Sequence, residues 1–198
     1  MQAKLGAIYC DVERFADAIP LLEEALRKGY KDPEGAWVGK NALLTAYLRT
    51  GKTTEAAALA TEQVRAARQL FPADSPWLGV ALADTGKALL GGKAYAAAEP
   101  LLRESLSLGE RLGPDGWDTH HARSLVGGVL LGQQKYAAAE PLLRNGYEGL
   151  RRTQGGIVRE VKGVTLRGAL ERLVELYDAW GQPDEAAKWR KALEKGKE

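Results

Sequence analysis

The sequence has little of several features that mark common protein classes. It contains one cysteine, Cys10, which excludes an internal disulfide and fits a reducing compartment. It has no run of about 18 apolar residues, the length that a membrane-spanning helix needs, and its N-terminus lacks the pattern of a secretory signal. Its 28 basic and 26 acidic residues give a net charge of +2, which does not favour nucleic acid or an anionic membrane. We therefore expect a cytoplasmic protein that binds neither.

Residues that carry catalysis or bind metals are also scarce. The two histidines, His120 and His121, are adjacent, so on a helix they point about 100° apart and suit joint metal binding poorly; we expect a surface pair. Residues 51–53 (Gly-Lys-Thr) resemble the end of a P-loop, but Ala46 stands where that motif begins, and a turn between two helices explains them better. Cys10 has no activating histidine at a fixed spacing. The sequence predicts no enzyme activity, no cofactor and no metal.

What the sequence does contain is an internal repeat. Nine residues, Tyr-Ala-Ala-Ala-Glu-Pro-Leu-Leu-Arg, begin at Tyr95 and occur again from Tyr136, about 41 residues later, a period typical of repeat arrays. Within each copy the apolar residues recur every three or four positions, which places them on one face of a helix. The sequence thus predicts an all-α array of helix pairs.

The repeat extends over the whole chain, so we treat residues 1–198 as one array. Glycine-rich or proline-rich stretches separate the units, as they should where helices end and begin. The first unit has only the end of its first helix before the second helix starts, and we expect it to be partial. The last unit ends in a charged helix that suits a solvent-facing cap. The predicted units are about 1–29, 33–71, 75–112, 117–152 and 158–195.

Small and aromatic residues recur in these units in a fixed order. The first helix carries a glycine, at Gly6, Gly86 and Gly127; the second opens with an aromatic residue, at Phe15, Tyr95 and Tyr136, and has an alanine three residues later. This order resembles the tetratricopeptide repeat (TPR), specifically the variety of roughly 42 residues found in kinesin light chains and many bacterial proteins. The resemblance implies a right-handed TPR solenoid of antiparallel helix pairs that acts as a protein- or peptide-binding scaffold. We expect Gly127 to face Ala139 of its own hairpin.

The second unit departs most from this pattern. Thr45 stands in place of the glycine, Thr54 in place of the aromatic residue, and Ala57 at the alanine position. We expect its hairpin to be the most loosely packed. The first helices of units two to four each open near a tryptophan that we expect to pack against the preceding helix: Trp37, Trp77 and Trp117.

The C-terminal part carries a second resemblance. Its amino-acid sequence is similar to the end of the repeat regions that follow the kinase domain in large bacterial serine/threonine protein kinases. The similar residues are 114–119, 124–128, 131–136, 146–150, 169–173 and 189–190. The chain itself has no kinase motif. The likeness implies a fragment or C-terminal region of a larger bacterial signalling protein.

The expected binding surface is the concave face, which the first helices line in proteins of this kind. Positive residues at successive levels, with small residues between them, favour an acidic segment with one or two apolar anchors. The expected contact residues are Arg49, Lys87, His121, Ser124, Gly128, Glu171 and Glu175.

A structural role is the alternative. The partial first unit would expose Leu5, Ile8 and Tyr9, and an uncapped solenoid end tends to stack on another. In that case the chain would form a homodimer through its N-terminal face.

Overall fold

The computed structural model describes residues 2–29, 33–153 and 159–195. These ranges contain helices and no strand, which confirms the predicted all-α fold. In chain order the helices are α1 (Gln2–Asp11), α2 (Phe15–Lys28), α3 (Pro33–Arg49), α4 (Thr53–Leu70), α5 (Pro76–Gly91), α6 (Tyr95–Leu112), α7 (Trp117–Gly132), α8 (Tyr136–Arg152), α9 (Arg159–Ala179) and α10 (Pro183–Lys195). None of them combines the length and the apolar composition that crossing a bilayer requires.

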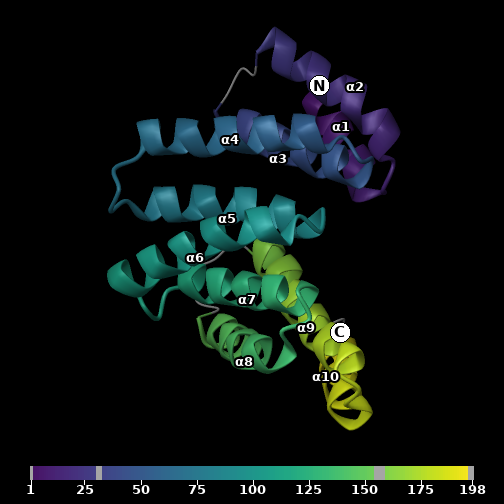
Figure 1. Ribbon diagram of the computed structural model, residues 1–198, viewed down its shortest axis with the longest axis vertical. Coiled ribbons are helices and arrows are strands. Elements are labelled where there is room, and N and C mark those ends of the chain that lie inside the picture. The colour runs from purple at the N-terminus through teal and green to yellow at the C-terminus, as the bar shows by residue number, and fades with distance from the viewer. Residues whose placement is uncertain (1, 30–32, 154–158, 196–198) are drawn as a thin grey trace.

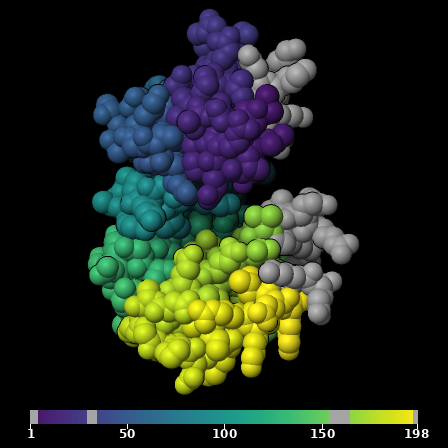
Figure 2. Space-filling view, turned by 90° about the vertical axis from the view of Figure 1, so that its right-hand side faces the viewer, coloured from purple at the N-terminus to yellow at the C-terminus, as the bar shows by residue number. Residues whose placement is uncertain are grey.

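The helices form antiparallel hairpins that stack in chain order (Figure 1). Each odd-numbered helix packs against its partner in the hairpin and against the odd-numbered helices of adjacent hairpins. In the described ranges, the backbones of the even-numbered helices of adjacent hairpins stay apart. The stack therefore opens on the even-numbered side and curves around the odd-numbered helices. Figure 2 shows the same succession from the side, with α5 and α6 (teal) between the two ends of the array.

Every hairpin turns through the same hydrogen-bonded loop. The second residue after the end of each first helix has a positive φ: Glu13 (58°), Gly51 (78°), Lys93 (61°), Gln134 (61°) and Gly181 (73°). The N–H of the residue that follows donates to the carbonyl five residues back, as from Arg14 to Tyr9 at 2.8 Å. This is the Schellman pattern, which satisfies the last carbonyls of a helix. The five positive-φ residues fix the register of the units.

In three hairpins the first helix crosses the second at a glycine that faces a leucine. A Cβ atom added to Gly127 would lie 2.7 Å from Cγ of Leu143, so only glycine fits there without displacing the leucine. The prediction that Gly127 faces Ala139 was wrong, because the leucine one turn further along α8 occupies the crossing. The three pairs are Gly6 with Leu22, Gly86 with Leu102, and Gly127 with Leu143.

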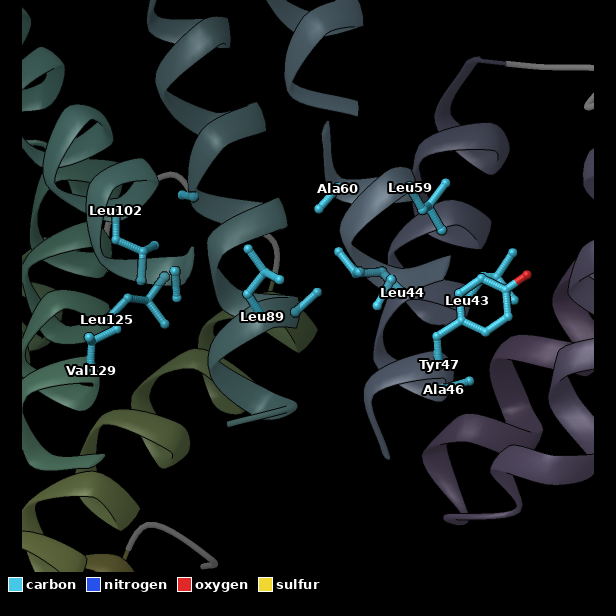
Figure 3. Close-up of a cluster of buried hydrophobic side chains, with 14 of the residues drawn as sticks. Leu43, Leu44, Ala46, Tyr47, Leu59, Ala60, Leu89, Leu102, Leu125 and Val129 are labelled. Carbon is cyan, nitrogen blue, oxygen red and sulfur yellow. The ribbon is translucent and has the colours of Figure 1, made fainter. Parts of the chain in front are cut away.

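The second hairpin reverses this pairing of small and large residues. In the register set by Gly51, Leu44 of α3 stands at the glycine position and Ala60 of α4 at the leucine position. Leu44 is fully buried and Ala60 is 9% exposed, and both belong to one apolar cluster that extends from α2 to α7 (Figure 3). The large side chain thus comes from the first helix here and from the second helix in the three hairpins that have a glycine at the crossing.

The predicted register of this unit was wrong by one residue. Thr53, which begins α4, stands at the aromatic position instead of Thr54, and the buried Ala56 stands at the alanine position instead of the exposed Ala57. The expectation of loose packing is confirmed. Among the described residues, α3 and α4 approach each other at fewer points than the helices of any other hairpin.

Candidate functional site

An apolar opening lies where the second hairpin meets the third. We call it the junction groove: a cavity of about 650 Å³ lined by α3 (Ala36, Trp37, Val38, Lys40), α4 and its C-terminal end (Gln63, Ala66, Ala67, Leu70, Phe71) and α5 (Trp77, Val80, Ala81, Asp84). Three of its apolar side chains are largely exposed: Val38 at 52%, Trp77 at 67% and Leu70 at 72%. Large apolar groups gathered on an open surface indicate a binding site.

The two tryptophans of the junction groove are held differently. The indole N–H of Trp37 donates to a carboxylate oxygen of Asp84 at 3.0 Å, which ties α3 to α5 across the groove. Trp77 lies in the first turn of α5, where Ser75 caps the helix by accepting from the Trp77 backbone N–H at 3.2 Å. Trp77 lines the groove together with Leu70 at the end of the preceding helix, but the residue is 67% exposed, so the predicted packing against that helix is partial.

A second, more polar cavity of about 220 Å³ continues along the odd-numbered helices. This inner groove is lined by α5, α7 and the start of α9, with Ser105 of α6 at its side, and it shares Val80 and Asp84 with the junction groove. Its charged and titratable residues are Asp84, Lys87, Asp118 and His121. The apolar junction groove thus adjoins, at Val80 and Asp84, a groove with charges of both signs.

Burial perturbs the titratable groups of the inner groove. It raises the pKa of Asp84, although the Trp37 hydrogen bond and the charge of Lys87 act in the opposite direction. It also raises the pKa of Asp118. It lowers the pKa of His121 to about 3, and the positive charges of Lys87 and Arg172 add to this effect. His121 is therefore neutral near pH 7 and contributes no positive charge to the groove.

The residues predicted to line one concave face do not all lie together. Lys87 and His121 line the inner groove. Arg49, in contrast, lies at the end of α3, where its guanidinium is 3.5 Å from the Glu13 carboxylate and 4.9 Å from the centre of the Phe15 ring. Arg49 is the last residue of α3 and lies beside the α1–α2 loop. Its charge therefore interacts with the first hairpin.

Ser124 and Gly128 of α7 were expected to be open and are buried. Arg172 of α9 covers them: its Nε and Nη2 atoms each donate to Ser124 Oγ at 3.3 Å, and its Cδ atom lies 2.8 Å from where a Cβ of Gly128 would stand. Sequence reasoning missed Arg172. The signal for it was the absence of a side chain at Gly128, which leaves room for a long residue from the next hairpin.

The two glutamates predicted on α9 differ in their partners. Glu171 accepts from Nε of Arg167 at 2.9 Å. Glu175 is exposed, forms no ion pair with a described residue, and has its pKa raised by partial burial of its carboxyl group. Among the α9 residues whose side chains are described, Glu175 thus has a carboxylate without an ion-pair partner.

The expectation of a surface histidine pair was wrong. His120 is 2% exposed and packs against Gly149, and its Nδ1 atom is 2.9 Å from Nη1 of Arg123, which donates. His121 is half-buried on another face of α7. In the described ranges no cluster of three or more histidine, cysteine or acidic residues could hold a metal ion.

With the geometry established, comparison with known proteins identifies the architecture. The chain matches no protein-family model and no curated protein. Among solved structures it is similar to BtubC (BKLC) from P. vanneervenii, with 16% identity and a TM-score of 0.64 over 98% of this chain and 77% of that one. It is also similar to a putative kinesin light chain of Podosopora anserina with nearly identical TPR-like repeats, with 16% identity and a TM-score of 0.61 over 99% of this chain and 93% of that one.

The fold is a TPR-like helical-repeat solenoid. At this level of identity the likeness concerns the fold. In the TPR-like stack, the inner groove runs along the layer of odd-numbered helices, and the junction groove is the place where two hairpins separate.

Proposed function

We propose that the chain is a non-enzymatic scaffold module that binds a protein or peptide segment, and that it belongs to a larger bacterial signalling protein in the cytoplasm. The observation that carries the binding function is the junction groove, with its exposed Val38, Leu70 and Trp77 and with Val80 and Asp84 shared with the charged inner groove. The TPR-like fold supports a scaffold function. The sequence similarity of residues 114–193 to the repeat regions of bacterial serine/threonine kinases supports the signalling context.

The proposed ligand is an extended or short helical segment with an apolar anchor. The anchor would fill the junction groove against Trp77, and the residues beside it would reach the inner groove. Lys87 is exposed and forms no ion pair with a described residue, so an acidic residue at that level of the ligand is favoured. His121 and Arg49 do not add free positive charge, because the first is neutral and the second is paired with Glu13.

The test uses fluorescent peptides that carry one central tryptophan or leucine between acidic, neutral or basic residues. Trp77→Ala should weaken binding by about tenfold, because an exposed aromatic anchor of an interface is lost. Leu112→Ala is the matched control, since Leu112 is 47% exposed and lies outside both grooves. Equal affinities of the two variants, with unchanged circular dichroism, would exclude the junction groove as the binding surface.

Self-association is a second candidate, and α1 favours it. Leu5, Ile8 and Val12 follow one another at helical spacing and are 40%, 54% and 59% exposed. Tyr9 is not part of this face, because it is half-buried in the core and carries the guanidinium of Arg14 4.6 Å above its ring. Ile8→Lys should abolish any dimer measured by light scattering over a concentration series. A monomer at every concentration would exclude this alternative.

A further inference from the structure

A polar cavity that shares no residue with either groove lies in the fourth hairpin, between α7, α8 and the loop before α7. Its volume is about 440 Å³. We call it the arginine cavity, because it is lined by three arginines. Five of its lining side chains can donate hydrogen bonds, which an anionic ligand would accept: His120, Arg123, Asn145, Arg151 and Arg152.

One hydrogen-bond donor of this cavity has no acceptor. A guanidinium can only donate, so the 2.9 Å contact from Nη1 of Arg123 makes Nδ1 of His120 an acceptor. Burial lowers the pKa of His120, and the charges of Arg123 and Arg152 add to this effect, so the imidazole is neutral at pH 7 and carries its proton on Nε2. The Asp115 carbonyl acts on the ring in the opposite direction, from outside the geometry of a normal hydrogen bond. The Nε2 atom is buried and has no hydrogen-bond partner among the described residues, which is costly unless a ligand supplies one.

Two of the three arginines are free of acidic partners in the described part of the chain. Arg123 donates from Nη2 to the Glu110 carboxylate at 3.1 Å, and its side chain is 17% exposed. Arg151 and Arg152 are exposed in the last turn of α8, and neither forms an ion pair with a described residue. Arg152 also acts as a positive charge on His120, which places its guanidinium near the unpaired imidazole N–H. The two free guanidiniums and this N–H thus belong to one cavity.

We propose that the arginine cavity binds a phosphate monoester group. A phosphate group presents three strong acceptor oxygens in different directions, and guanidiniums bind pairs of such oxygens. Donors from both α7 and α8 suit this tetrahedral group better than they suit a flat carboxylate. In the complex, Arg151 and Arg152 bind the outer oxygens and the His120 Nε2–H donates to an inner one. The site is independent of the peptide binding proposed for the two grooves.

Acidic residues around the cavity favour one phosphate group over a polyanion. Asp115 and Glu148 are exposed and line the cavity, and Glu110 is paired with Arg123. A membrane or a nucleic acid spread over this face would meet these carboxylates together with the arginines, so that repulsion would offset much of the attraction. A single phosphate group between α7 and α8 meets mainly the donors. It can come from a free phosphate compound or from a phosphorylated side chain, which present the same chemistry.

Inorganic phosphate is the first probe, followed through the His120 imidazole by NMR. The chain has two histidines, so His121→Gln assigns the His120 signals in nitrogen–proton correlation spectra. Phosphate added at constant pH and ionic strength should shift these signals, and acetate at the same concentration should shift them less. Absence of a shift with phosphate, or an equal shift with chloride, would overturn the proposal.

Variants at exposed positions locate the effect and leave the core intact. Arg151→Gln and Arg152→Gln should each weaken phosphate binding by about tenfold, the effect of one charged hydrogen bond. Glu148→Gln should strengthen it, because a like charge is removed from the lining. Arg65→Gln is the control, since Arg65 is exposed on α4, forms no ion pair with a described residue and lies outside this cavity. A loss in Arg65→Gln equal to that in Arg152→Gln would show a general charge effect and overturn the site.

A pair of peptides, one with serine and one with phosphoserine, identifies the source of the phosphate. Tighter binding of the phosphoserine peptide than of inorganic phosphate, lost in Arg152→Gln, would support a phosphorylated segment. Equal binding of the two would support a free phosphate compound. Binding to phosphatidylserine vesicles that Arg152→Gln abolishes would overturn the assignment to a single phosphate group. Trp77→Ala should leave phosphate binding unchanged, so this site and the junction groove can fail independently.

Discussion

At the scale of single residues, Gly127 and Gly128 are neighbours with different surroundings. A Cβ atom on Gly127 would meet Cγ of Leu143 at 2.7 Å and the backbone nitrogen of Leu143 at 3.1 Å. We expect Gly127→Ala to lower the free energy of unfolding by about 2 kcal/mol, the cost of overpacking a core. Gly128→Ala should cost less, because the atoms it meets belong to the flexible side chains of Arg172 and Leu90. Chemical denaturation measures both, and equal losses would contradict this assignment.

His121 gives a prediction on pH. Its pKa is about 3 in the folded protein and near 6.5 when the chain is unfolded, so between these values the unfolded state binds the extra proton. The stabilisation from the neutral imidazole is fully present above pH 6.5 and is lost as the pH falls toward 3. His121→Gln should therefore show a smaller loss of stability than wild type between pH 7 and pH 4. Parallel pH profiles for the two proteins would show that His121 titrates normally.

The positions of these residues could be recognised from the sequence, but the residues that they contact in the fold could not. The glycine of each crossing could be recognised because its position repeats, but the atom it meets belongs to the next helix, and periodicity does not decide between Ala139 and Leu143. Arg172 was harder to foresee. Its importance depends on which way a long side chain extends from α9, after the longest interval between units, and no local pattern specifies that direction.

At the scale of helices, the reversed pair of the second hairpin can be tested by a double-mutant cycle. Leu44→Ala should destabilise the protein by about 3 kcal/mol, as expected for a buried leucine. Because Ala60 occupies the partner position, Leu44→Ala combined with Ala60→Leu should lose less stability than the sum of the two single changes. Denaturation of the four proteins measures the coupling. Strict additivity would mean that the two side chains do not share the same space.

Helices were easier to predict than their register. The ends of α4 and α6 follow from turn residues and apolar spacing, which the sequence displays directly. In the second unit the marker aromatic is missing, and placing Thr45 and Thr54 at the marker positions makes Gly51 equivalent to Gly92, whereas its positive φ makes it equivalent to Lys93. The turn accepts either a glycine or a long polar residue at that position. Residue type alone therefore did not reveal the shift.

At the scale of the whole molecule, α4 has open space on both flanks. The junction groove lies on one side, and a cavity of about 660 Å³ lies between α4 and the third hairpin on the other, lined by Ala57, Ala60, Val64 and Leu101 among others. The Trp37–Asp84 hydrogen bond and an ion pair of 2.7 Å between Arg68 and Glu104 cross this junction. The array thus divides, between α1–α4 and α5–α10, at a junction that has open space on both flanks of α4.

This division predicts unequal local stability. Backbone amides of α3 and α4 should exchange with deuterium faster than those of α7 and α8, because helices with fewer packed neighbours open more readily. Hydrogen exchange followed by mass spectrometry measures the difference. A peptide that fills the junction groove should slow exchange in α3 and α4 selectively. Uniform protection along the array would contradict the division.

The reversed pair in the second hairpin also restricts how such an array can evolve. Repeat proteins gain and lose units by recombination between copies, which succeeds when the helices of different copies are interchangeable. A recombinant joining α3 to α8 would bring Leu44 against Leu143, two leucines at one crossing, and one joining α7 to α4 would leave Gly127 against Ala60, two small residues and a void. The second hairpin can be inherited or deleted only as a whole.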